Sequence, residues 1–181
     1  NRELLGKSAQ LLLSEKITDV QQRLESMATK DDIHNALTFN DQGELQNLEK
    51  TYGGQFNALH SLRILPWDQL GTAGIKQKGI TFNNNIELML VSKAGGGSTA
   101  ISPEAYSVGK LQLFSFAQAI IANEQVVGVV LLSLKTDFIK QLINKPFFTE
   151  KGEMEVKLGF HYQPELHFSF ALSDHMSASV M

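Results

Sequence analysis

The sequence predicts an α+β fold, in which a long N-terminal helix and several short helices flank an antiparallel sheet. Two observations carry this prediction. Residues 1–27 space their apolar side chains as a helix does, and residues 111–134 form two β-rich apolar runs joined by a short polar break. With 181 residues, 43% of them hydrophobic, the chain has enough apolar material for one substantial core.

The first helix carries an apolar seam. Its members follow one another at intervals of four and three residues, as in a coiled coil: Leu13, Ile17, Val20, Leu24 and Met27. The charged and amide side chains between them, including Gln21 and Glu25, form a face suited to solvent. Two interpretations follow. The helix packs its seam against its own domain, or it emerges from a membrane and pairs with a second copy of the chain.

Two short helices and a strand come next. Residues 31–37 and 44–56 show helical spacing, and Thr29 followed by Asp32 forms a capping signature for the first of them. Residues 58–65 then predict a strand, which a proline ends.

Residues 84–94 suit either a buried strand or a short helix. The preceding asparagine and the following Gly95 favour the helix. Residues 103–108 predict a short edge strand before the hairpin at 111–134. Because residues 126–134 are apolar almost throughout, this last strand should be covered on both faces.

The C-terminal part predicts a further helix and two strands. Thr136 caps the helix, and residues 153–160 and 166–170 alternate apolar and polar side chains as strands do. Residues 173–181 show little periodicity.

The composition excludes several classes of function. A formal net charge of −3 offers no electrostatic basis for binding nucleic acid. The absence of cysteine excludes disulfides, thiol catalysis and cysteine-ligated zinc. No run approaches the roughly 18 apolar residues of a membrane span.

No group of residues indicates catalysis. The glycine-rich residues 94–99 lack the lysine and the preceding strand of a phosphate-binding loop. His161 and His167 would face each other across a hairpin, and Asp174 or His175 might complete a zinc site. The preferred interpretation is a surface hairpin with incidental histidines, so we expect no catalytic residue, no metal and no cofactor.

A pocket for a small molecule is predicted beneath the helix at 84–94. Arg63 lies between apolar neighbours on its strand and suits a carboxylate or phosphate group. Tyr106 and Gln118 are the other polar residues expected near that space. The expected ligand is therefore an organic acid or a sugar phosphate. The alternative places Arg63 on a solvent-exposed face.

The order of elements resembles that of extracytoplasmic Cache or PAS-like sensor domains. A closer resemblance, over roughly residues 20–145, is to the N-terminal membrane-anchored extension of some bacterial phosphomannomutase/phosphoglucomutase enzymes. The matching pieces are MATKDDIHNAL, LQNLEKTYGGQFNALHSLRILP, FNNNIELMLVSKAGG, PEAYSVGKLQLFSFAQAI and VVGVVLLSL. The mutase's Thr-Ala-Ser-His-Asn phosphorylation pattern is absent, so no catalytic residue carries over.

These resemblances imply a non-enzymatic sensory or regulatory domain on the periplasmic face of the inner membrane. Residues 1–30 would be a membrane-proximal helix and residues 31–181 a single PAS-like/Cache domain. The helix would form a homodimer, and membrane spans would flank the sequence. One alternative attaches the domain to a chemoreceptor, a histidine kinase or a diguanylate cyclase. Another is a structural dimerisation or protein-docking module that binds no small molecule.

Overall fold

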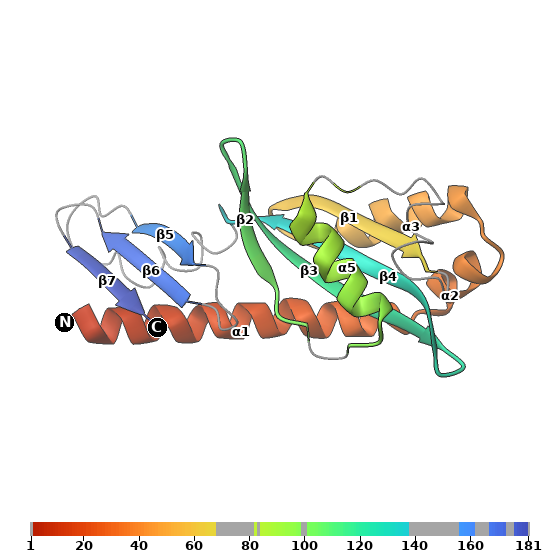
Figure 1. The fold of residues 1–181 in the computed structure, drawn as a ribbon, viewed down its shortest axis with the longest axis horizontal. Helices are drawn as coiled ribbons and strands as arrows, with labels where there is room; N and C mark the ends of the chain where they lie inside the picture. Colours follow the sequence, from red (N-terminus) through yellow and green to blue (C-terminus); the bar gives the residue numbers. More distant parts are fainter. Residues whose placement is uncertain are drawn as a thin grey trace. The chain divides into compact units, whose positions relative to one another are not determined.

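The computed structural model describes residues 2–67, 82, 84–98, 101–137, 156–161, 167–172 and 176–180, with side chains for those between 10 and 137. The chain divides into two compact units, residues 1–19 with 136–181 and residues 20–135. The larger unit contains helices and a four-stranded antiparallel sheet (Figure 1), so the predicted α+β class is confirmed. The proposed division at residue 30 stays a prediction.

Helix α1 spans Arg2–Ala28, close to the predicted bounds. All five seam side chains are buried, with exposed fractions between 1% and 8%: Leu13, Ile17, Val20, Leu24 and Met27. Leu11, outside the seam, is 61% exposed. Because the seam is buried in a single chain, the structure favours the interpretation in which the helix packs on its own domain.

Helix α2 spans Asp31–Thr38, and its predicted cap is wrong. Lys30 occupies the N-cap position and makes no side-chain cap hydrogen bond. The Thr29 hydroxyl donates instead to the Ser26 carbonyl of the preceding helix, at 2.7 Å. A threonine at the end of one helix was therefore mistaken for the start of the next.

Helix α3 spans Gln42–Gly53 and packs against the first strand. The Asp41 side chain caps it by accepting a hydrogen bond from the Glu44 backbone N–H, at 3.0 Å. Near its end, the Tyr52 hydroxyl lies 2.9 and 2.8 Å from the two carboxylate oxygens of Asp32. This contact links α3 to α2.

The main sheet has the strand order β1-β4-β3-β2, with all neighbours antiparallel. Its strands are β1 (Leu59–Pro66), β2 (Glu104–Val108), β3 (Leu111–Ala122) and β4 (Gln125–Lys135). Every residue of β4 from Gly128 to Leu134 is buried. The predicted cover on both faces of this strand is confirmed.

The hairpin between β3 and β4 turns through two residues with positive φ, Asn123 at 51° and Glu124 at 63°. Two successive positive values define a type I′ turn, whose twist matches that of the flanking strands. The turn lies where the polar break predicted it.

Helix α5 (Asn85–Gly95) packs across β3 and β4 (Figure 1), which confirms the helical interpretation of this segment. The Asn84 side chain caps the helix by accepting from the Glu87 N–H, at 2.9 Å. At the other end, the Trp67 ring fills the space that a Cβ on Gly95 would need. The core between the helix and the sheet consists of Leu65, Leu90, Val91, Ala94, Ala117, Ala119, Val129 and Leu131.

A separate three-stranded sheet follows, with the order β5-β6-β7. Its strands are β5 (Val156–His161), β6 (His167–Leu172) and β7 (Met176–Val180). The first two confirm the predicted strands, and β7 was missed. Residues 138–155, where the helix capped by Thr136 was predicted, lie outside the described residues.

Candidate ligand pocket

The three predicted site residues lie on different parts of the main sheet. Partners across an antiparallel ladder share a face, and successive residues alternate. Arg63 pairs with Leu131, which belongs to the core beneath α5, whereas Gln118 pairs with Val130 and so faces the other way. The structure does not bring these residues into one cavity, and ligand binding by each stays a prediction.

Arg63 lies on the edge strand β1, at the α5 face. Its guanidinium carbon lies 5.6 Å from the centre of the Phe82 ring, which is within range of a cation–π contact. Burial raises the pKa of Glu49 on α3, and the charge of Arg63 opposes part of that rise. Arg63 thus already interacts with an aromatic ring and a carboxyl group.

Tyr106, on the opposite edge strand β2, belongs to a buried polar chain. Its hydroxyl donates to Glu87 Oε1 at 3.2 Å and lies 2.8 Å from the Ser115 hydroxyl, which lies 2.7 Å from that of Ser133. Glu87 is 2% exposed, and both serines are fully buried. Since the single hydroxyl hydrogen of Tyr106 goes to Glu87, Ser115 must donate to Tyr106. These bonds hold α5 to three strands.

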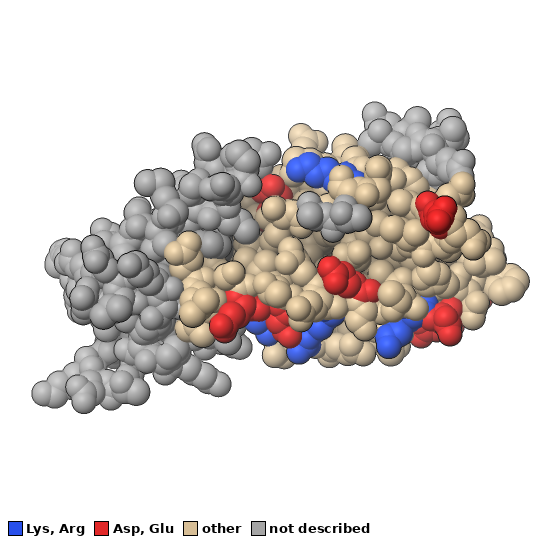
Figure 2. Space-filling view, turned by 90° about the horizontal axis from the view of Figure 1, so that it is seen from below, with Lys and Arg blue, Asp and Glu red and all other residues tan. Residues whose placement is uncertain are grey.

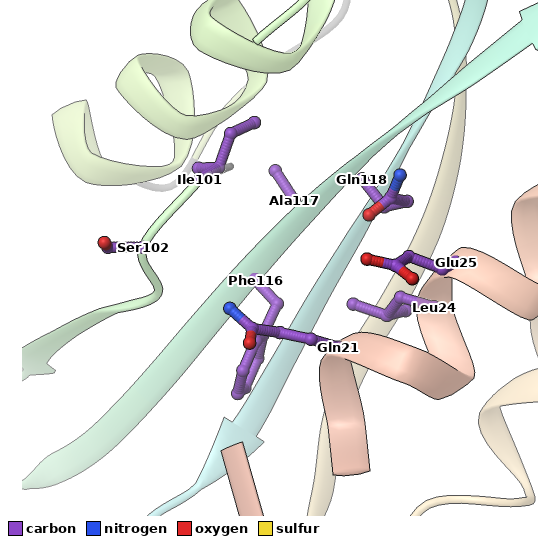
Figure 3. A pocket seen from close by; sticks show the side chains of 8 residues that line it. All are labelled: Gln21, Leu24, Glu25, Ile101, Ser102, Phe116, Ala117 and Gln118. Carbon is purple, nitrogen blue, oxygen red and sulfur yellow. The ribbon is translucent and has the colours of Figure 1, made fainter. Parts of the chain in front are cut away.

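Gln118 lines a pocket of about 250 Å³ on the α1 side of the sheet (Figure 3). Helix α1 supplies one wall, strand β3 a second, and the segment before β2 a third. The lining residues are Gln21, Leu24, Glu25, Ile101, Ser102, Phe116, Ala117 and Gln118. All of them belong to the same compact unit, residues 20–135.

The pocket exists because strand β3 is longer than its partner β2. The ladder between them ends at the pair Glu104–Ser115. Beyond it, in the part of the chain that the structure describes, residues 116–122 pair with β4 only. Alternate backbone groups on this edge therefore remain available for hydrogen bonds.

The walls of the pocket differ in chemistry. Leu24 and Phe116 are almost fully buried, and the Phe116 ring lies against Phe114 with centroids 5.3 Å apart. Gln21 and Gln118 are half-buried, and Glu25 is exposed. The pocket thus combines a rigid apolar wall with a polar rim.

Sequence reasoning named Gln118, but for a cavity beneath the helix at 84–94, and it did not consider Gln21 and Glu25 as pocket residues. Both had been assigned to the polar, solvated face of the first helix. Because the buried seam is narrow, residues beside Leu24 reach over the edge of the sheet. No sequence signal separates such rim residues from fully solvated ones.

The described residues show no gathering of metal ligands. Among their side chains, no three His, Asp or Glu residues lie close enough to hold an ion. His161 and His167 are paired across β5 and β6, as the hairpin interpretation predicted. Asp174 and His175 lie outside the described residues.

Two surface properties complete the description. In the part of the molecule coloured in Figure 2, acidic and basic side chains are interspersed, without a broad field of one sign. Among the described helices, none is both long enough and apolar enough to cross a membrane.

The fold belongs to the class of α+β folds in which a long helix accompanies an antiparallel sheet, and it resembles a solved sensor domain. This is the sensory domain of the Campylobacter jejuni chemoreceptor Tlp3 (CcmL), in a crystal structure with isoleucine bound. The TM-score is 0.52 at 15% identity, covering 86% of this chain and 65% of the other. The chain thus spans less than two thirds of that domain. No protein-family model and no curated protein matches the chain.

Proposed function

We propose that this chain is a ligand-binding sensory domain of a bacterial signalling protein of the chemoreceptor type. The likeness in fold to a chemoreceptor sensory domain supports the class. The pocket between α1 and β3 is the observation that carries the proposal, because a ligand there would touch both the long helix and the sheet.

The mechanism follows from that position. Gln21, Leu24 and Glu25 come from α1, whereas Phe116 and Gln118 come from β3. A ligand that binds one arrangement of these two elements better than another shifts the population towards it. The change in the position of α1 relative to β3 would then be transmitted along the length of this helix. The ligand can shift this equilibrium by no more free energy than the difference between its binding free energies for the two states.

The setting is part of the proposal. The domain would lie on the periplasmic face of the inner membrane, with membrane spans in flanking sequence. A homodimer would use an exposed face of α1 around Leu11, since the seam itself is buried. Analytical ultracentrifugation tests this point, and a strictly monomeric chain at high concentration would contradict it.

Two other interpretations are less well supported. A docking module without a ligand would be favoured by a filled interior, whereas the larger unit contains a pocket with a polar rim. No comparison supports parentage by a phosphomannomutase/phosphoglucomutase. We therefore favour the receptor.

A thermal-shift screen of amino acids, organic acids and sugar phosphates tests the proposal. Binding to the folded state raises the unfolding temperature. At least one compound should stabilise the wild-type chain, and Ser102→Trp should abolish the shift by filling the pocket from its exposed rim. The control, Ser107→Trp, alters an exposed serine outside the pocket. Stabilisation by no compound, or an equal shift in the Ser102→Trp variant, would contradict the proposal.

A further inference from the structure

We propose that the pocket between α1 and β3 selects a small ligand that carries a protonated amine. This inference rests on the proposed function and names the ligand class of the same site. It differs from the anionic ligand that Arg63 predicted from the sequence.

The charge of the lining is the first reason. Among the lining side chains that the structure describes, Glu25 is the only ionisable one, and none of them is a lysine, arginine or histidine. Arg23, two positions before Glu25, donates instead to the Gln55 carbonyl at 3.4 Å. A carboxylate or phosphate would therefore enter beside a like charge without a cation from the lining to offset it.

The hydrogen-bonding groups are the second reason. An ammonium group carries three donors and no acceptor, so it needs several oxygens around it. Figure 3 shows the Glu25 carboxylate next to the Gln118 amide, with Gln21 on the same helix as Glu25. The Gln118 amide nitrogen already donates to the Ala119 carbonyl at 3.4 Å, which leaves its oxygen as the acceptor for a ligand.

The apolar walls define the rest of the ligand. Leu24, Ile101, Phe116 and Ala117 supply the apolar part of the lining. A volume of about 250 Å³ lies just below the range of about 300–1,000 Å³ typical of drug-sized ligands. The site therefore fits an amine with a short hydrocarbon body.

Isothermal titration calorimetry with three probes that share one side chain tests the charge preference. Leucinamide is cationic, N-acetylleucinamide neutral and N-acetylleucine anionic. Leucinamide should bind the wild-type chain at least about tenfold more tightly than either of the others. Glu25→Gln should remove most of this advantage while leaving the neutral probe unchanged. Glu15→Gln makes the same change of charge at an exposed position of α1 outside the pocket, and it should have no effect.

Each other outcome overturns the inference. N-acetylleucine binding as tightly as leucinamide would contradict the charge preference, as would leucinamide binding that does not depend on Glu25. Failure of all three probes to bind would also overturn it. If the thermal-shift screen still finds an anionic or neutral compound that Ser102→Trp blocks, the sensory proposal survives without the amine. If it finds none, both fail.

Discussion

The hydroxyl of the half-buried Tyr106 links several elements of the fold. It hydrogen-bonds with Glu87 on α5 and with Ser115 on β3. Tyr106→Phe should lower the free energy of unfolding by about 1–3 kcal/mol, because buried polar groups lose a partner. Urea unfolding measures this. Ser107→Ala, on the same strand but exposed, should change stability by less than about 0.5 kcal/mol. If Tyr106→Phe and Ser107→Ala changed the free energy of unfolding equally, the hydrogen bonds of Tyr106 would not be what holds α5 to the sheet.

Tyr52 should make the stability sensitive to alkaline pH. Burial, followed by the hydrogen bond to Asp32 and the charge of that residue, raises the pKa of Tyr52 from 10.0 to about 12. The folded state thus favours the neutral phenol. Its contribution is fully present below pH 10 and is lost as the pH rises towards about 12.

Unfolding midpoints across this pH window provide the measurement. Tyr52→Phe should flatten the decline that the wild-type chain shows. Asp32→Asn should make the decline smaller and end it at a lower pH, since it removes two of the causes that raise the pKa of Tyr52 in the folded state. A decline identical in all three proteins would show that Tyr52 plays no part in it.

The candidate site could be predicted from the sequence only in part. Gln118 was expected in a cavity beneath the helix at 84–94, whereas it lines the pocket beside α1, and its role in ligand binding stays a prediction. Arg63 was grouped with Gln118, but the two side chains lie on opposite faces of the sheet. Whether two residues share a face depends on the register across the intervening β4. That register appears only in the assembled sheet, where Arg63 pairs with Leu131 and Gln118 with Val130, and no local pattern in the sequence reveals it.

At the scale of elements, Gly128 on β4 lies in close contact with α2 and with strand β1. A Cβ on Gly128 would lie 2.8 Å from Leu37 Cδ1 and 3.1 Å from the Leu65 backbone oxygen. Gly128→Ala should therefore lower the free energy of unfolding by about 1–3 kcal/mol through overpacking.

Chemical denaturation of Gly128→Ala beside Gly54→Ala checks this. Gly54 has a φ of −62°, and its nearest contacts to a Cβ are at 3.5 Å. Alanine there should be neutral or slightly stabilising, because it restricts the unfolded chain. If both substitutions lowered the free energy of unfolding by similar amounts, lack of room for a Cβ at residue 128 would not be the cause.

Elements with strong local signals could be predicted well. The hairpin of β3 and β4 was found from its polar break, and α5 from Asn84 before it and Gly95 at its end. Elements without such signals were missed. Strand β7 alternates apolar and polar residues over only five positions, and its serine and alanine side chains are small, so the strand signal is short and weak. Thr29 failed as a cap because it bonds backwards to Ser26.

At the scale of the whole molecule, the order of elements along the chain indicated the fold class correctly. It could not specify the strand order β1-β4-β3-β2, in which β1 pairs with β4, the last strand of this sheet along the chain. The length of β3 beyond β2, which opens the pocket, is also a property of the assembled sheet. The composition of the lining therefore emerges only once α1 and β3 lie together.

The location of ligand binding is the central claim, and NMR chemical-shift mapping tests it most directly. The compound that stabilises the chain best in the thermal-shift screen would be titrated into isotopically labelled protein. The amides of residues 21–25, 101–102 and 116–118 should then show the largest shifts. Largest shifts around Arg63 and Tyr106 on the α5 face, with none in these three segments, would contradict the claim.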